Sequence, residues 1–202
     1  MPYRISQIQF HRISDNYKYL LDSNIWIEIL TSRNAKSPRH KKYLTFFSQL
    51  TSNPNVKIVL PALLVSEVLN RILREVCMSK YAIKNGLNRS QITSEYYKTV
   101  YRSTQDFKDS YNSLCDDISN YSASLELISD GFGTDISFDD IMSNPPVGLD
   151  FNDYFYFNLA KKNNYFIVTD DKDFFVEDIQ IITESPSLIE RKNLALVKTV
   201  EK

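Results

Sequence analysis

The chain has 202 residues, of which 43% are hydrophobic and 13% aromatic, so it can bury one sizeable core and is too apolar for a disordered chain. Four glycines and seven prolines exclude a collagen-like chain. Two widely separated cysteines, Cys77 and Cys115, argue against a disulfide framework or a zinc site, and free thiols in a reducing cytoplasm fit best. We expect residues 1–202 to form a single domain.

The formal net charge of −1 hides a marked asymmetry along the chain. Residues 71–108 carry eight Lys or Arg against three acids, whereas residues 109–153 carry ten acids and neither Lys nor Arg. The first stretch could attract phosphates, although such runs are as typical of ordinary solvated helical faces. The start shows no secretory leader, and no window approaches 18 uncharged apolar residues, so we expect a cytoplasmic protein without a membrane-spanning helix.

The first third of the chain alternates between expected strands and helices. After an irregular leader, residues 17–21 predict a short buried strand that ends at Asp22. Ser23 and Asn24 can then cap an amphipathic helix at residues 25–30. A second helix is expected to begin at Ser37-Pro38 and to end near residues 53–54.

The next unit is again a strand followed by a helix. Residues 56–60 predict a buried strand, and Pro61 suits the first position of a helix. Apolar residues then recur at helical spacing, which leaves Glu67, Arg71 and Arg74 on the opposite, polar face.

The middle of the chain, residues 78–130, is polar and mostly helical in character, and its apolar positions include Leu125 and Ile128. Gly131-Phe132-Gly133 ends that stretch, and a loop through Asn144-Pro145-Pro146 and Gly148 follows.

Regular elements resume in the last quarter of the chain. We expect an aromatic-rich helix from Asp150 to about Lys162, a strand at residues 165–168, and a last strand at residues 179–182 before a polar tail. Strands that alternate with helices predict an α/β fold with a central, mainly parallel sheet covered on both faces.

Four acidic residues are the candidate site. In a parallel sheet the strand-to-helix turns meet at one edge, so Asp22, directly after the first strand, and Asp171, three residues beyond Val168, are expected at that edge. Glu67 lies about two turns into its helix. Asp153 lies in the first turn of the helix that begins near Asp150.

Clustered carboxylates repel one another at neutral pH, so such a site needs protons or a cation. Oxygen ligands favour Mg²⁺ or Mn²⁺ over zinc, and these ions can polarise a phosphodiester while activating a water as nucleophile. Each acid also has a purely structural interpretation. Asp22 could cap a helix, Glu67 could pair with Arg71, Asp153 could favour a helix N-terminus and Asp171 could form a turn. Only the combination favours a metal site.

These motifs resemble those of the PIN-domain nucleases, in particular the VapC-type toxins. Tyr19-Leu20-Leu21-Asp22-Ser23-Asn24 is similar to the opening motif of the family, and Pro61 to Leu69, which contains Glu67, is similar to the second motif. Asp153 to Ala160 and Val168 to Phe174 resemble the third and fourth motifs, the last in the form T-x-D-x-D-F. The match covers residues 17–75 and 150–183.

The resemblance implies a three-layer α/β/α fold with a helical insertion at about residues 78–148. It also implies a choice among neighbouring acids, because its spacing favours Asp153 over Asp150 as the third ligand. Asp171 becomes the fourth ligand, with Asp173 as a supporting or alternate one. Asn24 and Thr169 would be polar residues that orient the site or the substrate.

The implied activity is metal-dependent hydrolysis of RNA by Asp22, Glu67, Asp153 and Asp171 with Mg²⁺ or Mn²⁺. A toxin of this type implies an antitoxin partner and a homodimer. Basic side chains would guide the RNA backbone, either from residues 71–108 or from a group that comprises Arg33, Lys36, Arg39, Lys41 and Lys42.

Two other interpretations are open. The same fold could act as a non-catalytic scaffold through its helical insertion. A haloacid-dehalogenase-like phosphatase also places an aspartate after its first strand, but it needs a second aspartate two residues later, where this chain has Asn24.

Overall fold

The computed structural model describes residues 3–31, 37–129, 136–143 and 148–200, and it contains a parallel β-sheet. The six strands of this sheet are β1 (Arg4–Ser6), β2 (Lys18–Leu21), β3 (Lys57–Pro61), β4 (Leu125–Ile128), β5 (Phe166–Val168) and β6 (Gln180–Ile182). Their order is β1-β6-β5-β2-β3-β4, and every neighbouring pair is parallel. The prediction of a mainly parallel sheet is confirmed.

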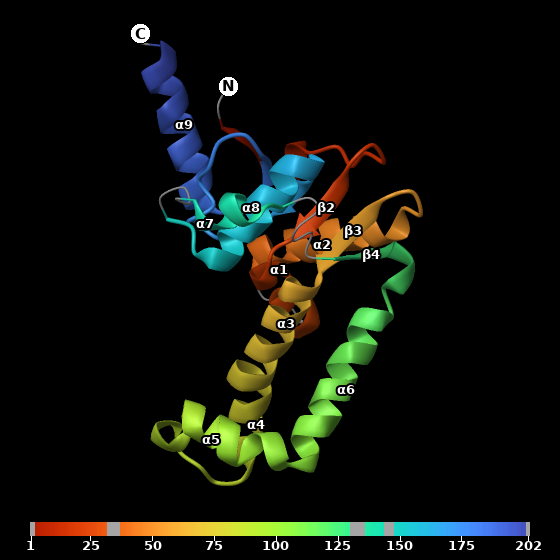
Figure 1. Cartoon of the computed structure of the whole chain (residues 1–202), viewed down its shortest axis with the longest axis vertical. Coiled ribbons are helices and arrows are strands. Elements are labelled where there is room, and N and C mark those ends of the chain that lie inside the picture. Colours follow the sequence, from red (N-terminus) through yellow and green to blue (C-terminus); the bar gives the residue numbers. More distant parts are fainter. Residues whose placement is uncertain (1–2, 32–36, 130–135, 144–147, 201–202) are drawn as a thin grey trace.

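The helices pack around this sheet in a three-layer α/β/α arrangement (Figure 1). The α-helices of the described residues are α1 (Ser23–Thr31), α2 (Pro38–Ser52), α3 (Ala62–Arg71), α4 (Met78–Lys84), α5 (Ser94–Thr99), α6 (Gln105–Ser119), α7 (Phe138–Met142), α8 (Phe151–Asn163) and α9 (Pro186–Val200). A π-helix at Ile72–Cys77 joins α3 to α4, and short 3-10 turns lie at Ile8–Phe10, Arg89–Gln91, Tyr101–Ser103 and Ser122–Ser124. The expected fold class is therefore confirmed.

The core lies on the inner strands β2, β3 and β5. Apart from Lys18 and Lys57 at their starts, the side chains of these strands are apolar on both faces. Leu20, Ile58 and Ile167 are fully buried. Strands covered by helices on both faces are expected to be continuously apolar in this way. This buried centre fixes the strand ends from which the candidate site is built.

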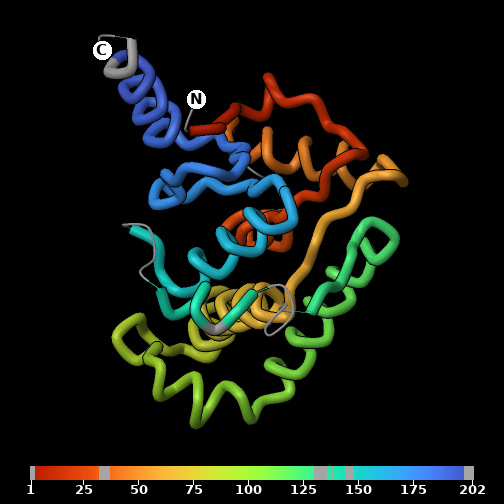
Figure 2. The backbone as a smooth tube through the Cα atoms, turned by 45° about the horizontal axis from the view of Figure 1, so that its top comes forward, coloured from red at the N-terminus to blue at the C-terminus, as the bar shows by residue number. Residues whose placement is uncertain are grey.

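Residues 62–119 form a helical arm that extends away from the sheet (Figure 1). Helix α3, the π-helix and α4 lead outward, and α6 returns beside them after α5; Figure 2 shows the same arrangement from another direction. The helical character expected for residues 78–119 is observed. Among the described residues, no helix combines the length and apolar character that crossing a bilayer requires.

Four expectations about secondary structure were wrong. The irregular leader contains β1, and the helical interpretation of Leu125 and Ile128 fails because these residues form β4. Both strands are short and pair with partners far away in sequence, so local periodicity carries little signal for them. Pro61 is the last residue of β3, in register with Ile128, and not the first residue of the helix.

The fourth error concerns the C-terminal segment, where the expected polar tail is helix α9. This helix begins at Pro186 and is anchored through Leu188, which is fully buried. Most of its later side chains are exposed, which explains the polar impression that its sequence gives. The expected turns at residues 131–133 and 144–146 lie outside the described residues.

Candidate functional site

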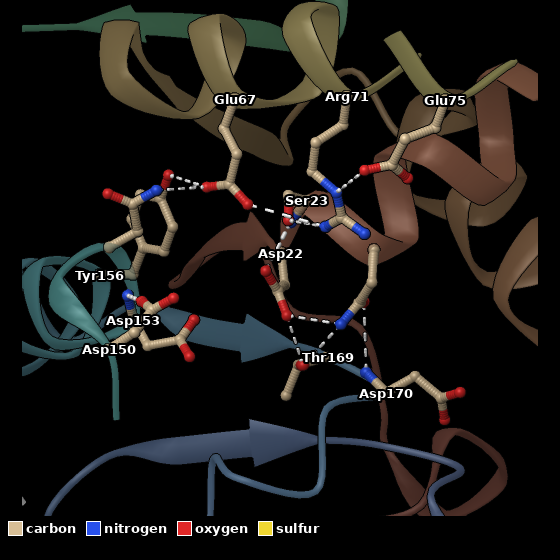
Figure 3. A network of polar contacts seen from close by, with 12 residues as sticks. Asp22, Ser23, Glu67, Arg71, Glu75, Asp150, Asp153, Tyr156, Thr169 and Asp170 are labelled. Atoms are coloured by element: carbon tan, nitrogen blue, oxygen red, sulfur yellow. Dashed lines mark hydrogen bonds and ion pairs between the residues drawn. The ribbon is translucent and has the colours of Figure 1, made fainter. Parts of the chain in front are cut away.

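Asp22 and Thr169 meet at the carboxyl ends of the neighbouring strands β2 and β5. The register pairs Leu21 with Val168, and the Asp22 amide donates a 2.9 Å hydrogen bond to the Val168 carbonyl. Thr169 Oγ1 in turn donates a 2.7 Å hydrogen bond to Asp22 Oδ2. The sheet topology thus brings the first and last motifs of the sequence into direct contact (Figure 3).

The carboxylate of Asp22 is only 4% exposed and is held by several donors. The Ser23 amide donates to Oδ1, and Asn24 Nδ2 donates to Oδ2 at 2.7 Å. Asn24 Oδ1 also accepts a 3.4 Å hydrogen bond from the Asp170 amide, which ties the start of α1 to the loop after β5. Asn24 and Thr169 therefore both donate hydrogen bonds to the same oxygen of Asp22.

The loop after β5 contains three acids, Asp170, Asp171 and Asp173, and each has different hydrogen-bond partners. The Asp171 amide donates to Thr169 Oγ1 at 2.9 Å, and Asp171 Oδ1 accepts from the Asp173 amide at 2.9 Å. The carboxylate of Asp170 is engaged instead by the Tyr43 hydroxyl at 3.0 Å and by Arg39 at 3.2 Å. Within the described part of the chain, no hydrogen bond occupies the second carboxylate oxygen of Asp171, whose charge acts on Asp22, whereas Asp173 contributes its backbone to the turn.

Glu67 reaches the same edge from α3, and its carboxylate touches helix α8. Asn152 Nδ2 donates to Glu67 Oε2 at 2.9 Å, and the Tyr156 hydroxyl donates to the same oxygen at 3.1 Å. The pairing with Arg71 that the sequence suggested is present but looser, at 3.8 Å from Glu67 Oε1. Arg71 also donates a 3.1 Å hydrogen bond to Ser23 Oγ (Figure 3).

Sequence reasoning missed Asn152 and Tyr156 as partners of Glu67. The available signal was their i, i+4 spacing, which places both on one face of α8 on either side of Asp153. That spacing alone does not predict which segment of the chain packs against this face of α8.

Asp150 and Asp153 have distinct positions at the start of α8. Asp150 is the N-cap residue, and its Oδ1 accepts a 3.0 Å hydrogen bond from the Asp153 amide. The Asp150 side chain thus satisfies one of the free amides that every helix start presents. Asp153 takes part in this cap through its backbone amide and not through its carboxylate.

The four carboxylates Asp22, Glu67, Asp153 and Asp171, which we call the acid cluster, influence one another electrostatically. The pKa of Asp22 is raised to about 6, mainly by burial and to a smaller extent by the charges of Glu67 and Asp171, while hydrogen bonds from Thr169 and Ser23 act to lower it. Burial also raises the pKa of Asp153 to about 8, and its largest charge contribution comes from Asp22. The cluster therefore concentrates negative charge that is costly to keep uncompensated.

Tyr156 stays protonated beside this charge. Its side chain is fully buried, and burial followed by the charge of Glu67 raises its pKa well above the ordinary value. Its hydroxyl is therefore a permanent donor to Glu67.

The donor set fits a hard divalent cation, because carboxylate oxygens are the ligands that such ions prefer. Within the described ranges, however, no three acidic, histidine or cysteine side chains are arranged closely enough to hold a metal ion as they stand. The carboxylates lie at the same edge of the sheet and raise one another's pKa, but they do not form a complete coordination site.

The basic residues expected to guide a substrate are placed unevenly. Lys42 pairs with the nearly buried Glu184 at 2.6 Å, and Arg39 pairs with Asp170, so both are engaged in structural contacts. Arg71 instead lies beside the acid cluster with 38% of its side chain exposed. Arg33 and Lys36 lie outside the described residues.

Acids at the carboxyl edge of a parallel sheet, held by strand-end and helix-start donors, make up the candidate site of this α/β protein. The family model described as PIN domain matches residues 19–177, which include the whole acid cluster. The chain belongs to the PIN-domain family. PIN domains are generally nucleases, and PIN nucleases generally use divalent metals.

Comparisons with solved structures and with curated proteins add little to the family assignment. A chain in the crystal structure of VapBC2 from Rickettsia felis bound to a DNA fragment from their promoter aligns with a TM-score of 0.44 and 15% identity, covering 82% of this chain and 97% of that chain. No curated protein matches the sequence.

Proposed function

We propose that the protein is a metal-dependent endoribonuclease and the toxin of a toxin–antitoxin pair. The observation that carries the nuclease proposal is the acid cluster itself: Asp22 and Asp171 are linked through the Thr169 hydroxyl, and Glu67 and Asp153 face them from α3 and α8. The toxin assignment is supported by the resemblance of the four motifs to those of VapC-type proteins.

The acid cluster would hold one or two Mg²⁺ or Mn²⁺ ions, which supply charge stabilisation at a phosphodiester and activate a water. Asp22 and Asp171 would bind from the strand ends, and Glu67 and Asp153 from the two helices. The residues around them keep these carboxylates in place. Thr169 and Asn24 donate to Asp22, and the Asp173 amide holds one oxygen of Asp171, so the other stays available.

Substrate binding in this proposal relies on Arg71. Its guanidinium lies between the Ser23 hydroxyl and Glu67, and neither of its ion pairs, with Glu67 and with Glu75, is closer than 3.8 Å. Loosely paired guanidinium groups retain N–H donors, and these suit phosphate oxygens well. An RNA backbone lying against the acid cluster would therefore meet a positive charge next to its scissile phosphate.

Cleavage of labelled single-stranded RNA in Mn²⁺ tests the nuclease proposal. We expect wild-type protein to cut and EDTA to abolish cutting. Asp22→Asn and Asp171→Asn should reduce the rate at least 100-fold, whereas Asp178→Asn, which alters an exposed acid paired with Lys161, should cut normally. Equal cutting by the first two variants would contradict the assignment, and no cutting by any form would favour a non-catalytic scaffold. Single-stranded DNA of the same sequence provides the arm that tests preference for RNA.

Partner binding needs separate experiments. A neighbouring small gene whose product binds the chain and blocks cleavage would support the antitoxin proposal, and a co-expressed product without effect on cleavage would oppose it. Analytical ultracentrifugation of the chain alone tests the proposed homodimer, because a sedimentation coefficient that stays monomeric at high protein concentration would exclude it.

A further inference from the structure

The orientation of Glu67 is set by two side chains of α8, Asn152 and Tyr156, which are not among the four acids of the candidate site. Its Oε2 atom accepts hydrogen bonds from Asn152 at 2.9 Å and from Tyr156 at 3.1 Å, while Oε1 is directed toward Arg71 and Asp22 (Figure 3). The two oxygens of this carboxylate are therefore not equivalent. Oε2 is hydrogen-bonded to α8, and Oε1 is directed toward Arg71 and Asp22.

Both donors come from the helix that also carries Asp153. Asn152 and Tyr156 are four residues apart on one face of α8, and Asp153 directly follows Asn152. Helix α8 thus supplies one member of the acid cluster and holds a second member that belongs to α3. A shift of α3 relative to α8 would break these hydrogen bonds and separate the two carboxylates.

A glutamate side chain has three rotatable bonds, and fixing it costs conformational entropy. Tyr156 is rigid and fully buried, and Asn152 is partly buried, so their donors hold Glu67 in one orientation before any ligand arrives. Residues that orient a metal ligand through hydrogen bonds typically contribute 10- to 100-fold to metal affinity.

We propose that Asn152 and Tyr156 are positioning residues that hold Glu67 ready for a divalent cation and thereby set the affinity of the protein for that cation. The inference rests on the proposed function, because it takes Glu67 as a ligand. Neither residue needs to touch the substrate. Their removal therefore weakens cation binding more than it affects the rate at saturating cation.

Isothermal titration calorimetry of the full chain with Mn²⁺ alone tests this inference. Tyr156→Phe and Asn152→Ala should each weaken Mn²⁺ binding about tenfold. Tyr154→Phe is the matched control, because its hydroxyl lies on the same helix but contacts Ser143, at 2.9 Å. That variant should bind Mn²⁺ like the wild type, and thermal unfolding should show all three variants folded.

A double-mutant cycle separates positioning from a merely structural role. In a Glu67→Gln background, which itself binds Mn²⁺ more weakly, Tyr156→Phe should produce no further loss, because its effect passes through the carboxylate. In cleavage assays both single variants should approach the wild-type kcat when Mn²⁺ is raised about tenfold.

The possible failures are distinguishable. Wild-type protein that binds no Mn²⁺ would overturn the proposed function and this inference together. Wild-type protein that binds Mn²⁺ and loses it in Glu67→Gln, but not in Tyr156→Phe or Asn152→Ala, would overturn this inference alone. An equal loss from Tyr156→Phe in the wild-type and Glu67→Gln backgrounds would also overturn it.

Discussion

Thr169 Oγ1 donates a 2.7 Å hydrogen bond to Asp22 Oδ2 and accepts one of 2.9 Å from the Asp171 amide. A single buried hydroxyl therefore connects the two strand-end acids, which lie 149 positions apart in the sequence (171 − 22). Because the hydroxyl both donates and accepts, it fixes the Asp22 carboxylate and the loop that carries Asp171 at the same time. The placement of Asp171 relative to Asp22 therefore relies on this hydroxyl.

Replacing Thr169 with Val tests that dependence, because Val keeps the shape and removes the hydroxyl. We expect the free energy of unfolding to fall by about 1–3 kcal/mol, since the buried Asp22 loses a donor and the Asp171 amide loses its acceptor. Cleavage should fall at least tenfold. Urea denaturation and RNA cleavage measure the two effects. Thr169→Ser restores the hydroxyl and should recover most of the activity; a Val variant as active as wild type would contradict the prediction.

The acid cluster should make the stability of the metal-free protein decline as pH rises from acidic to slightly alkaline values. The folded-state pKa of Asp153 is raised from 3.8 to about 8, so the folded state binds more protons than the unfolded state between these values. Stability in EDTA should therefore fall as pH rises from about 4 to 8. Asp153→Asn removes this contribution, so its decline should be shallower and its stability at pH 8 greater than that of wild type. Urea unfolding at several pH values measures both slopes.

The same measurement has an internal control. Asp178 is exposed, and Lys161 lowers its pKa, so Asp178→Asn should leave the decline between pH 4 and 8 almost unchanged. Adding Mn²⁺ should stabilise the wild type more at pH 8 than at pH 5, because the ion competes with protons for the carboxylates. Identical slopes for wild type and Asp153→Asn would show that Asp153 does not carry this charge penalty.

The strand-end part of the site was predictable, and the structure shows why. Asp22 and Asp171 each follow a buried apolar strand, and parallel topology alone sends both to one edge. The contacts of the acids that lie on helices could not be predicted in the same detail. Contact between Glu67 and the pair Asn152 and Tyr156, which lie 85 and 89 positions further along the chain, depends on how α3 meets α8, a relation that no local pattern encodes.

The fold shows a similar division between inner and edge strands. The inner strands were recognised from continuous buried apolar runs, whereas β1 and β4 sit at the two edges of the sheet and are only partly buried. In β4, Leu127 is 77% exposed, so the strand lacks the burial pattern that identifies its inner neighbours. Such strands exist because a preformed neighbour offers backbone hydrogen bonds, which is information from the tertiary structure.

Tyr43 should prove essential for stability, because it ties α2 to two strand ends. Its hydroxyl lies 3.1 Å from the Thr169 carbonyl and 3.0 Å from Asp170 Oδ1, and it accepts a 2.7 Å hydrogen bond from the buried Glu184 amide. Tyr43→Phe leaves that amide without this acceptor, so we expect a loss of about 1–3 kcal/mol in urea denaturation. Tyr111→Phe, at a side chain with 43% exposure, should change stability by less than about 0.5 kcal/mol.

Arg71 should affect RNA binding more than folding. Its guanidinium bonds to Ser23 and pairs loosely with Glu67 and Glu75, and much of the side chain is exposed. Arg71→Met keeps most of the apolar stem and removes the charge. We expect KM for single-stranded RNA to rise about fivefold or more, with the dependence of binding on salt reduced by about one phosphate contact.

The control for Arg71 is a cation remote from the acid cluster. Lys161 pairs with Asp178 at 2.8 Å on the exposed end of α8, so Lys161→Met removes the same charge without changing the site. It should leave KM and its salt dependence unchanged. Arg71→Lys separates charge from geometry: an ammonium group cannot reproduce the planar donors of a guanidinium, so we expect only partial recovery of KM. If Arg71→Met and Lys161→Met raise KM equally, general surface charge explains the effect, and Arg71 has no specific role at the scissile phosphate.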